Sequence, residues 1–271
     1  MSQTVLITGA STGIGRSTAM YFQEKGWNVI ATMRTPEKEE ELQKLANVLI
    51  AKLDVTDLDS IDKAIQLGIE KFGKIDALVN NAGYGAYGPL EAFPRENIVR
   101  QFNTNVIGLL DVTRAILPHF RKNKSGIIVN ISSIGGKMTF PLGSLYHGTK
   151  FAVEGISEAL NYELEQIGCR VKIVEPGAIA TDFASRSFDF SNDESLVEYQ
   201  ETVNKLMTGF QQALNKTSEP IVVAKVIYEA ITDGSSKLRY EAGDDAVELM
   251  ANRKKLDDDS FIGNIKSMFG L

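Results

Sequence analysis

Short apolar segments alternate with longer segments of mixed polarity along most of the chain. Several of the short segments are nearly continuous runs of apolar residues, as is typical of strands buried on both faces of a parallel sheet. We expect six such strands, at residues 4–8, 28–32, 47–53, 75–80, 126–132 and 170–175.

The segments between these strands repeat apolar residues every three or four positions, which predicts amphipathic helices. The stripe of residues 57–72, for example, comprises Leu58, Ile61, Ile65 and Phe72. We expect Thr56 and Asp59 to form a capping box at its start. Alternating strands and helices predict a parallel sheet with helices on both faces. With right-handed crossovers, residues 1–271 should form an α/β single-domain Rossmann fold, a doubly wound parallel sheet.

Residues 182–216 interrupt this alternation, because they are polar and irregular at first and then helical. They carry the aromatic residues Phe183, Phe188, Phe190, Tyr199 and Phe210. A long excursion at the carboxyl edge of such a sheet is where a lid over a binding site would lie. We therefore expect a substrate lid at about residues 182–216 within the single domain.

Gly9, Gly13 and Gly15 follow the first expected strand with the spacing G-x-x-x-G-x-G. Glycines there permit a tight turn and let backbone N–H groups approach a pyrophosphate, which indicates a dinucleotide-binding loop. At the end of the second strand, where a carboxylate would bind the ribose of NAD, the chain has Met33 and Arg34. Because a guanidinium can pair with a 2′-phosphate, the sequence favours NADP (NADPH), with NAD as the alternative.

The segment LYHGTKFAVEG, residues 145–155, places Tyr146 and Lys150 four positions apart on one face of an expected helix. An ammonium group so close should lower the phenol pKa from its usual value of about 10. Tyr146 could then exchange a proton with an alcohol or a carbonyl. The alternative is a tyrosine packed into the core beside a solvated lysine. His147 points off the shared face, so we do not expect it to be a base.

Three further polar positions could belong to the same site. Ser132 and Ser133 end the fifth expected strand, where side chains alternate, so that only one of them can face a substrate. Asn105 lies on an apolar helical stripe. A buried amide needs hydrogen-bond partners, and on the pattern alone Asn105 is best explained as a structural asparagine.

The composition excludes several classes of function. A net charge of -6 and a pI of about 5.2 do not suggest binding to nucleic acid or to an anionic membrane surface. The single cysteine, Cys169, excludes an internal disulfide and a cysteine metal cage, and the two histidines lack metal-ligand spacing, so we expect no metal. No apolar run reaches the roughly 18 residues of a membrane span, and no signal peptide is evident. We expect a cytoplasmic protein.

Taken together, these motifs resemble the short-chain dehydrogenase/reductase family. TGASTGIG (8–15) is similar to its cofactor loop, and LDVTD (53–57) to its adenine-contacting turn. NNAG (80–83) is similar to the family motif after the fourth strand, and EPGAIATD (175–182) to the turn beside the nicotinamide. The segments ATMR and RYEAGDDA resemble the branch that holds 17β-hydroxysteroid and retinol dehydrogenases.

The resemblance implies a catalytic tetrad of Asn105, Ser133, Tyr146 and Lys150. It selects Ser133 over Ser132 to stabilise charge on the reacting oxygen, and implies that Asn105 holds a water that relays protons to Lys150. It implies cofactor contacts from Tyr146 and Lys150 and from Gly9, Ser11, Thr12, Gly13, Ile14, Gly15, Arg34, Asp54, Val55, Asn81, Ala82, Gly83, Pro176, Gly177, Ile179 and Thr181.

The chain departs from the family pattern at two places. Gly148 and Thr149 stand where the family often has Ala and Ser, which preserves small size and one hydroxyl. Thr12 stands where many NADP enzymes carry Arg or Lys. Arg34, together with Arg16, would then supply the positive charge for a 2′-phosphate.

The expected activity is NADP(H)-dependent interconversion of a carbonyl and a secondary alcohol, with Tyr146 as general acid or base. Tyr84, Tyr87, Met138, Phe140 and Leu142, with the lid aromatics, either line an apolar pocket for a steroid-, retinoid- or lipid-like molecule or pack the lid onto the body. The alternatives are a cofactor-retaining dehydratase or epimerase, which the glycine spacing disfavours, and a non-catalytic NADP-sensing regulator, which the Tyr–Lys pair disfavours. The resemblance also implies a homodimer or homotetramer built on helices near 100–121 and 147–166.

Overall fold

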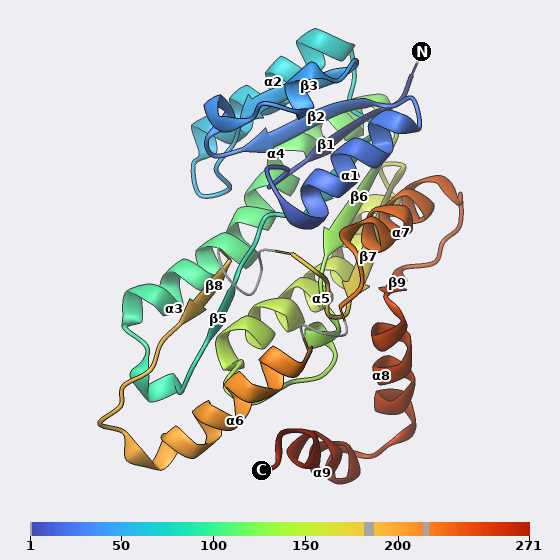
Figure 1. Cartoon of the computed structure of the whole chain (residues 1–271). Coiled ribbons are helices and arrows are strands. Elements are labelled where there is room, and N and C mark those ends of the chain that lie inside the picture. The colour runs from blue at the N-terminus through green and yellow to red at the C-terminus, as the bar shows by residue number, and fades with distance from the viewer. Residues whose placement is uncertain (1, 182–186, 214–216) are drawn as a thin grey trace.

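A seven-stranded sheet forms the centre of the computed structural model, which describes residues 2–181, 187–213 and 217–271 (Figure 1). The strand order is β3-β2-β1-β4-β6-β7-β9, and all neighbouring strands are parallel. The strands are β1 (Thr4–Ile7), β2 (Asn28–Met33), β3 (Val48–Lys52), β4 (Ala77–Asn80), β6 (Gly126–Ile131), β7 (Cys169–Pro176) and β9 (Arg239–Ala242). The predicted doubly wound Rossmann sheet is confirmed, and all six expected strands are present.

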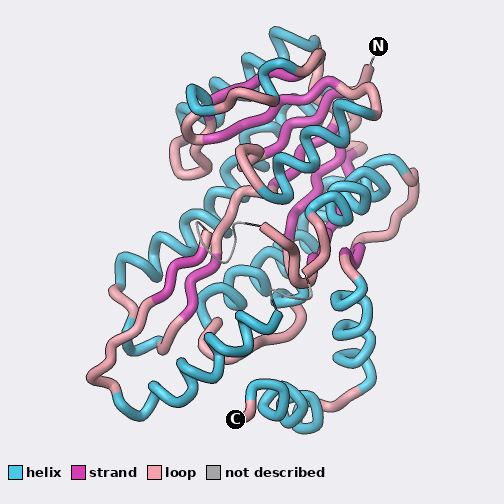
Figure 2. Tube along the Cα trace, viewed as in Figure 1, coloured by secondary structure: helices cyan, strands magenta, loops and turns pink. Residues whose placement is uncertain are grey.

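Helices cover both faces of this sheet, as Figure 2 shows. On one face lie α1 (Gly13–Glu24) and α7 (Pro220–Thr232), which bury Phe22, Val223 and Ile227 against the strands. On the other face lie α2 (Leu58–Phe72), α4 (Gly108–Asn123) and α5 (Ser144–Glu165). The two hydrophobic cores therefore fill the spaces between the sheet and its helical layers.

The start of α2 differs from the expected capping box. Asp57 is the N-cap residue, and its carboxylate accepts a hydrogen bond from Ser60 N at 3.3 Å. Thr56 instead belongs to the turn after β3, where its N–H and hydroxyl donate to Asp54 Oδ1 at 2.9 and 2.8 Å. The predicted Thr56–Asp59 box is wrong, because the extended backbone required of an N-cap is found one residue later, at Asp57.

A two-stranded parallel sheet lies beside the main body, formed by β5 (Gly85–Tyr87) and β8 (Phe188–Phe190). After β8 comes α6 (Val197–Ala213), so the part of the expected lid that the structure describes is one short strand and one helix. Asp189 in β8 pairs with Arg100 of α3 (Arg95–Phe102) at 2.5 Å. Residues 182–186 and 214–216, including Phe183, lie outside the described residues.

Two helices follow β9 at the carboxyl end, α8 (Asp244–Lys255) and α9 (Asp258–Phe269) (Figure 1). A separate core cluster there comprises Ile134, Met138, Ala246, Met250, Phe261 and Ile265. Met138 therefore packs against the C-terminal helices. The remaining regular segments are short 3-10 turns at Pro36–Lys38, Leu42–Lys44, Leu90–Ala92 and Ile134–Gly136, and a π-helical turn at Asn103–Ile107.

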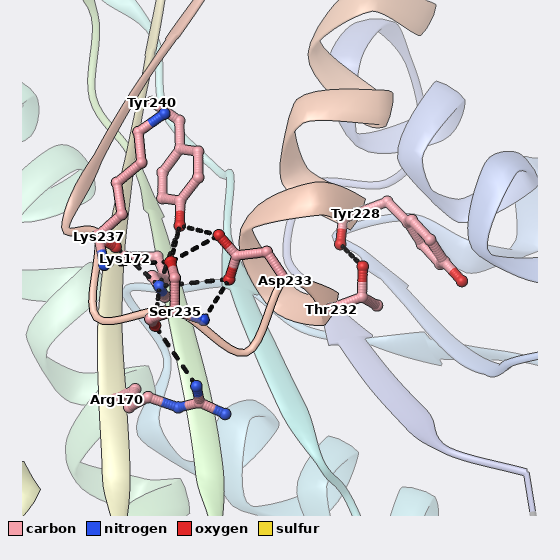
Figure 3. A network of polar contacts seen from close by, with 8 residues as sticks. All are labelled: Arg170, Lys172, Tyr228, Thr232, Asp233, Ser235, Lys237 and Tyr240. Carbon is pink, nitrogen blue, oxygen red and sulfur yellow. Dashed lines mark hydrogen bonds and ion pairs between the residues drawn. The ribbon is translucent and has the colours of Figure 1, made fainter.

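A buried lysine in the middle of β7 holds the loop that leads into β9 (Figure 3). Lys172 is only 1% exposed, and its Nζ donates to the carbonyl oxygens of Ser235 and Lys237, both at 2.7 Å. It also donates to Tyr240 Oη at 3.0 Å, and this hydroxyl donates to Asp233 Oδ2 at 2.7 Å. The network satisfies a buried charge and attaches the edge strand β9 to β7.

Candidate active site

The loop between β1 and α1 has the geometry of an anion site. Gly9 has φ 67 and Gly13 has φ 55, in the left-handed region that favours glycine. Helix α1 begins at Gly13, and no side chain of the described residues caps its N-terminus at Thr12. Backbone N–H groups in the first turn of a helix have no intrahelical acceptor and attract anions such as phosphate.

The NNAG segment after β4 holds this loop in place. Asn81 Nδ2 donates to Thr8 O at 2.8 Å and to Gly9 O at 3.1 Å. In return, Thr8 Oγ1 accepts from the N–H groups of Asn81 and Ala82, both at 3.0 Å. The ends of β1 and β4 thus meet where the strand order reverses, which is the usual position of a dinucleotide crevice in such sheets.

Gly15 is expected to tolerate no larger residue. A Cβ atom there would overlap the carbonyl oxygen of Gly9 and lie 2.5 Å from Asn81 Nδ2. Gly15→Ala should therefore weaken dinucleotide binding by ~10-fold or more, since overpacking costs about 1–3 kcal/mol. A fluorescence titration with NADPH measures this. As a control, Gly263→Ala in α9 adds a Cβ with no described atom within 4 Å and should leave affinity unchanged. Unchanged affinity in Gly15→Ala would show that dinucleotide binds elsewhere.

The turn after β7 lies against the glycine loop. A Cβ on Gly13 would be 3.2 Å from Thr181 Cγ2, so the predicted contact residue Thr181 adjoins the first turn of α1. Ala178 N donates to Asp245 Oδ2 at 2.7 Å, and Ala180 N donates to Ser218 O at 2.8 Å. Asp245 and Ser218 were missed from the sequence. The acidic segment AGDDA at the start of α8 was the sequence feature that could have identified Asp245. No feature of the neighbouring sequence identifies Ser218.

The other predicted cofactor residues are placed as follows. Asp54 is half-buried, and its Oδ1 is occupied by Thr56, so this carboxylate shapes the turn after β3. Val55 is buried against Gly108 of α4. Contacts of the remaining predicted residues with a dinucleotide stay predictions; these residues are Ser11, Ile14, Gly83, Pro176, Gly177 and Ile179.

The two arginines expected to supply charge differ in their surroundings. Arg34 is exposed directly after β2 and forms no ion pair with the described residues. Arg16 donates to Glu39 Oε2 at 2.7 Å and to Glu41 Oε2 at 2.6 Å. Because these two carboxylates already neutralise Arg16, the expectation that it assists Arg34 is not supported.

Tyr146 and Ser133 meet at the carboxyl end of β6. Tyr146 is 8% exposed, and its phenol is hydrogen-bonded to the Ser133 hydroxyl. Ser133 Oγ also accepts from Gly135 N at 3.0 Å. Ser132 Oγ lies on the other side, where it would be 2.6 Å from a Cβ on Gly136. The alternation expected for these serines therefore separates them, and Ser133 is the one beside Tyr146.

The electrostatics of the Tyr–Lys pair differ from the expectation. Burial raises the pKa of Tyr146 to about 12, and the Ser133 hydrogen bond acts in the opposite direction. Lys150 Nζ lies 5.8 Å from the Tyr146 ring centroid and donates to Ile131 O at 2.8 Å. Burial lowers the pKa of Lys150 to about 8. The predicted lowering of the tyrosine pKa is wrong here, because loss of hydration penalises the phenolate more than the Ser133 hydrogen bond favours it.

Asn105 sits in the π-helical turn that precedes α4 and is 3% exposed. Its Nδ2 donates to Tyr84 O at 2.8 Å and to Thr149 Oγ1 at 3.1 Å, and its Oδ1 accepts from Tyr84 N at 3.1 Å. Such π-helical turns often occur at functional sites. These hydrogen bonds fit the structural role that the apolar helical pattern of the sequence favoured for Asn105. The implied role of Asn105 in holding a water that relays protons to Lys150 stays a prediction.

His147 is a structural residue in this arrangement. Its Nε2 accepts from Phe140 N at 3.0 Å, so Nδ1 carries the proton and donates to Gly135 O at 3.0 Å. Burial lowers the pKa of His147 to about 4, which keeps the ring neutral. The histidine therefore fixes the loop between β6 and α5.

Aromatic side chains of the expected lid pack around Tyr146. Tyr87 has its ring centroid 5.5 Å from that of Tyr146, and Phe188 of β8 stacks on Tyr87 at 5.4 Å. Phe210 of α6 lies 5.3 Å from Tyr87, in an edge-on orientation. Of the residues expected either to line a pocket or to pack the lid, Tyr87 thus packs with the lid, whereas Phe140 contacts Phe269 of α9.

Within residues 2–181, 187–213 and 217–271, no group of three His, Cys, Asp or Glu side chains could hold a metal ion. No helix in the same ranges has both the length and the apolar composition needed to span a bilayer.

The structure combines a Rossmann-like α/β fold with a glycine-rich loop after β1 and a Tyr146–Ser133 pair after β6. Residues 3–192 match the family model described as short chain dehydrogenase. The chain therefore belongs to the short-chain dehydrogenase/reductase family.

Three similar proteins illustrate the family. An uncharacterised oxidoreductase of Schizosaccharomyces pombe is 47% identical over 239 residues, which cover 88% of this chain and 100% of the relative. A 3-ketodihydrosphingosine reductase of Bacteroides thetaiotaomicron is 41% identical over 181 residues, 67% of this chain and 65% of the relative. The solved structure of ElxO with NADP bound is 30% identical, with a TM-score of 0.72, covering 89% of this chain and 98% of that one.

Proposed function

We propose that the protein interconverts a carbonyl and a secondary alcohol with NADP(H), and that Tyr146 is its general acid and base. The observation that carries this proposal is the hydrogen bond between Tyr146 and Ser133, one helical turn from Lys150 and beside the crevice at β1 and β4. When bound there, the nicotinamide would supply or accept the hydride.

Each residue of the site has a separate task in this mechanism. Tyr146 donates its proton to the carbonyl oxygen during reduction and takes it back during oxidation. Ser133 donates a hydrogen bond to the same oxygen and stabilises the negative charge that develops on it. Lys150 offsets the negative charge of the phenolate left by proton donation and would hold the nicotinamide ribose when the cofactor is bound. A phenol with a raised pKa is protonated near neutral pH, which is the form that reduction requires.

The preference for NADP rests on Arg34, which is the exposed cation directly after β2. The similarity to the NADP-bound ElxO structure supports the same cofactor. Arg34→Ala should weaken NADPH binding by ~10- to 100-fold, because a hydrogen bond to a charged group contributes about 1.5–3 kcal/mol. NADH binding should hardly change. Lys71→Ala on α2 removes an equal charge elsewhere and should affect neither affinity. Equal losses for NADPH and NADH in Arg34→Ala would overturn the preference.

The substrate class follows from the apolar surroundings of the phenol. Tyr87, Leu142, Phe188, Leu206 and Phe210 gather around Tyr146. We propose that part of this packed cluster lines the substrate site when substrate binds, which favours a hydrophobic ketone with a steroid-, retinoid- or lipid-like body. The relative named as a 3-ketodihydrosphingosine reductase supports a lipid-like ketone. The described part of the expected lid, which contains β8 and α6, would close over this substrate.

A substrate screen tests the proposed reaction. Loss of the near-ultraviolet absorbance of NADPH in the presence of long-chain, steroid and retinoid carbonyls is the expected result. Absence of turnover with every carbonyl, while NADPH still binds, would favour the NADP-sensing regulator. Conversion of a substrate without net change in the cofactor would instead favour a dehydratase or an epimerase.

The protein is also proposed to form a homodimer or homotetramer. Large apolar side chains remain exposed on α3, α4 and α5 and on the π-helical turn: Val99, Phe102, Ile107, Leu110, Phe151 and Tyr162. Exposed apolar surface on neighbouring helices is typical of an interface between subunits.

A further inference from the structure

Two buried carboxyl groups lie behind Lys150, on the face of the sheet that α5 covers. Glu154 follows Lys150 by one helical turn, and its side chain is 5% exposed. Glu175 near the end of β7 is fully buried, at 0% exposure. Arg239 of β9 touches both, since its Nε donates to Glu154 Oε2 at 2.9 Å and lies 3.9 Å from Glu175 Oε1.

The two carboxyl groups have too few partners for two negative charges. Among the described residues, neither oxygen of Glu175 nor Oε1 of Glu154 has a hydrogen-bond partner. Arg239 also binds a third carboxylate, since its Nη2 donates to Glu158 Oε2 at 2.6 Å. A buried carboxylate without a counter-ion or hydrogen-bond donors is costly, and neighbouring carboxyl groups avoid this by sharing a proton.

Glu175 is the site at which that proton would reside. Burial raises the pKa of Glu175 to about 8, and the charges of Glu154 and Glu241 act in the same direction. The positive charges of Arg239 and of Lys137, which lies in the turn after β6, lower the pKa of Glu175. The charged groups that surround the pair are Lys150, Glu158, Lys137, Arg239, Glu241 and the Glu241 partner Lys254 of α8.

The pair is connected to the candidate active site through α5. Burial lowers the pKa of Lys150, and the Glu154 carboxylate opposes that shift. A Cβ on Gly136 would lie 2.9 Å from Glu154 Cγ and 3.0 Å from Lys150 O, so the two residues and this turn are in close contact. Glu154 also lines a surface groove of about 560 Å³ with Lys137, Arg239 and Gly136, whereas Glu175 is fully buried behind it.

We propose that Glu154 and Glu175 share one proton and act together as positioning residues for Lys150. The single negative charge of the pair resides on Glu154, where it keeps Lys150 protonated beside Tyr146. Proton exchange with water would pass through Glu154, which lines the groove. This inference rests on the proposed function, in which Lys150 supports proton transfer at Tyr146.

An NMR titration of ¹³C-labelled lysine tests the effect on Lys150 directly, with Lys150→Arg identifying the signal. Glu154→Gln removes the negative charge that raises the pKa of Lys150, so that pKa should fall by about half a unit to one unit. Glu175→Gln removes a group that is already neutral and should leave that pKa unchanged below about pH 7. Glu158→Gln is the matched control, because Glu158 bonds the same arginine but is 51% exposed. Coincident titrations of Lys150 in all four proteins would overturn the proposal.

The shared proton has its own signature in the pH dependence of stability. Glu175 has a raised pKa in the folded protein, so folded protein binds one proton more than unfolded protein between about pH 4.5 and about pH 8. The free energy of unfolding should therefore fall as pH rises through this window, with the slope that corresponds to the release of about one proton on unfolding. Glu175→Gln should lose this slope, and Glu154→Gln should narrow the pH window, because one of the charges that raise the Glu175 pKa is removed. Glu158→Gln should keep the slope. A slope that persists in Glu175→Gln would contradict the shared proton.

Neither measurement requires turnover. A chain that titrates as expected but reduces no carbonyl would contradict the proposed function and leave the effect of the pair on Lys150 established. If turnover occurs, the pH profile of kcat should move with the Lys150 pKa in Glu154→Gln. A kcat profile that stays fixed while Lys150 shifts would show that the pair has no part in catalysis.

Discussion

Replacement of Tyr146 by phenylalanine is expected to lower kcat for carbonyl reduction by ~10²- to 10⁴-fold, which is the usual contribution of general acid catalysis. The phenylalanine ring fills the same space among Tyr87, Leu206 and the lid aromatics, so folding should be preserved. The proton donor beside Ser133 is lost, however, at a position that is only 8% exposed. Initial rates at saturating NADPH measure the effect, and the affinity for NADPH should be nearly unchanged.

Tyr87→Phe is the matched control for this variant. Tyr87 is a second buried tyrosine, 5% exposed, whose ring lies 5.5 Å from that of Tyr146. Removal of its hydroxyl leaves Ser133 and Lys150 in place, so kcat should stay close to that of the natural chain. If Tyr146→Phe kept full activity, or if both variants lost activity equally, Tyr146 would not be the proton donor.

Lys172→Met is expected to lower the free energy of unfolding by about 3 kcal/mol, because removal of one partner from a buried charged network leaves the others unsatisfied. The methionine fills a similar volume but donates to neither the Ser235 nor the Lys237 carbonyl, and it leaves Asp233 without its ion-pair partner at 3.7 Å. Urea unfolding followed by circular dichroism measures the change.

Lys237→Met serves as the control for the Lys172 network. Lys237 is exposed, and its Nζ lies over the Tyr240 ring at 4.2 Å, a contact that contributes only about 0.5–1 kcal/mol at an exposed site. Folded Lys172→Met should still bind NADPH, because the network holds the loop before β9 rather than the glycine loop. Equal destabilisation by the two variants would show that the buried charge has no special role.

The central sheet could be predicted from the sequence because its strands are continuous apolar runs. β9 was not predicted, since only two of its four residues, Tyr240 and Ala242, are buried. β5 and β8 have three residues each, too few to show an alternating pattern. Their pairing depends on contacts between segments about a hundred residues apart, as in the register of Gly85 with Phe188.

In the candidate site, too, features set by neighbouring residues could be predicted, whereas features set by distant segments could not. The glycine loop and the separation of Ser132 from Ser133 depend on spacing along a few residues, so both could be predicted. The pKa of Tyr146 could not be predicted, because it depends on burial by Phe188, Leu206 and Phe210, which come from a distant segment. The Glu154–Glu175 pair was also missed, since its members come from different elements and meet through Arg239 of β9.

A crystal structure with NADPH bound tests the central claim most directly. We expect the Tyr146 hydroxyl to face the nicotinamide, with its hydrogen bond to Ser133 retained and Lys150 beside the ribose. A structure in which that hydroxyl turns away from the nicotinamide and is buried against Tyr87 and Phe188 would contradict the account.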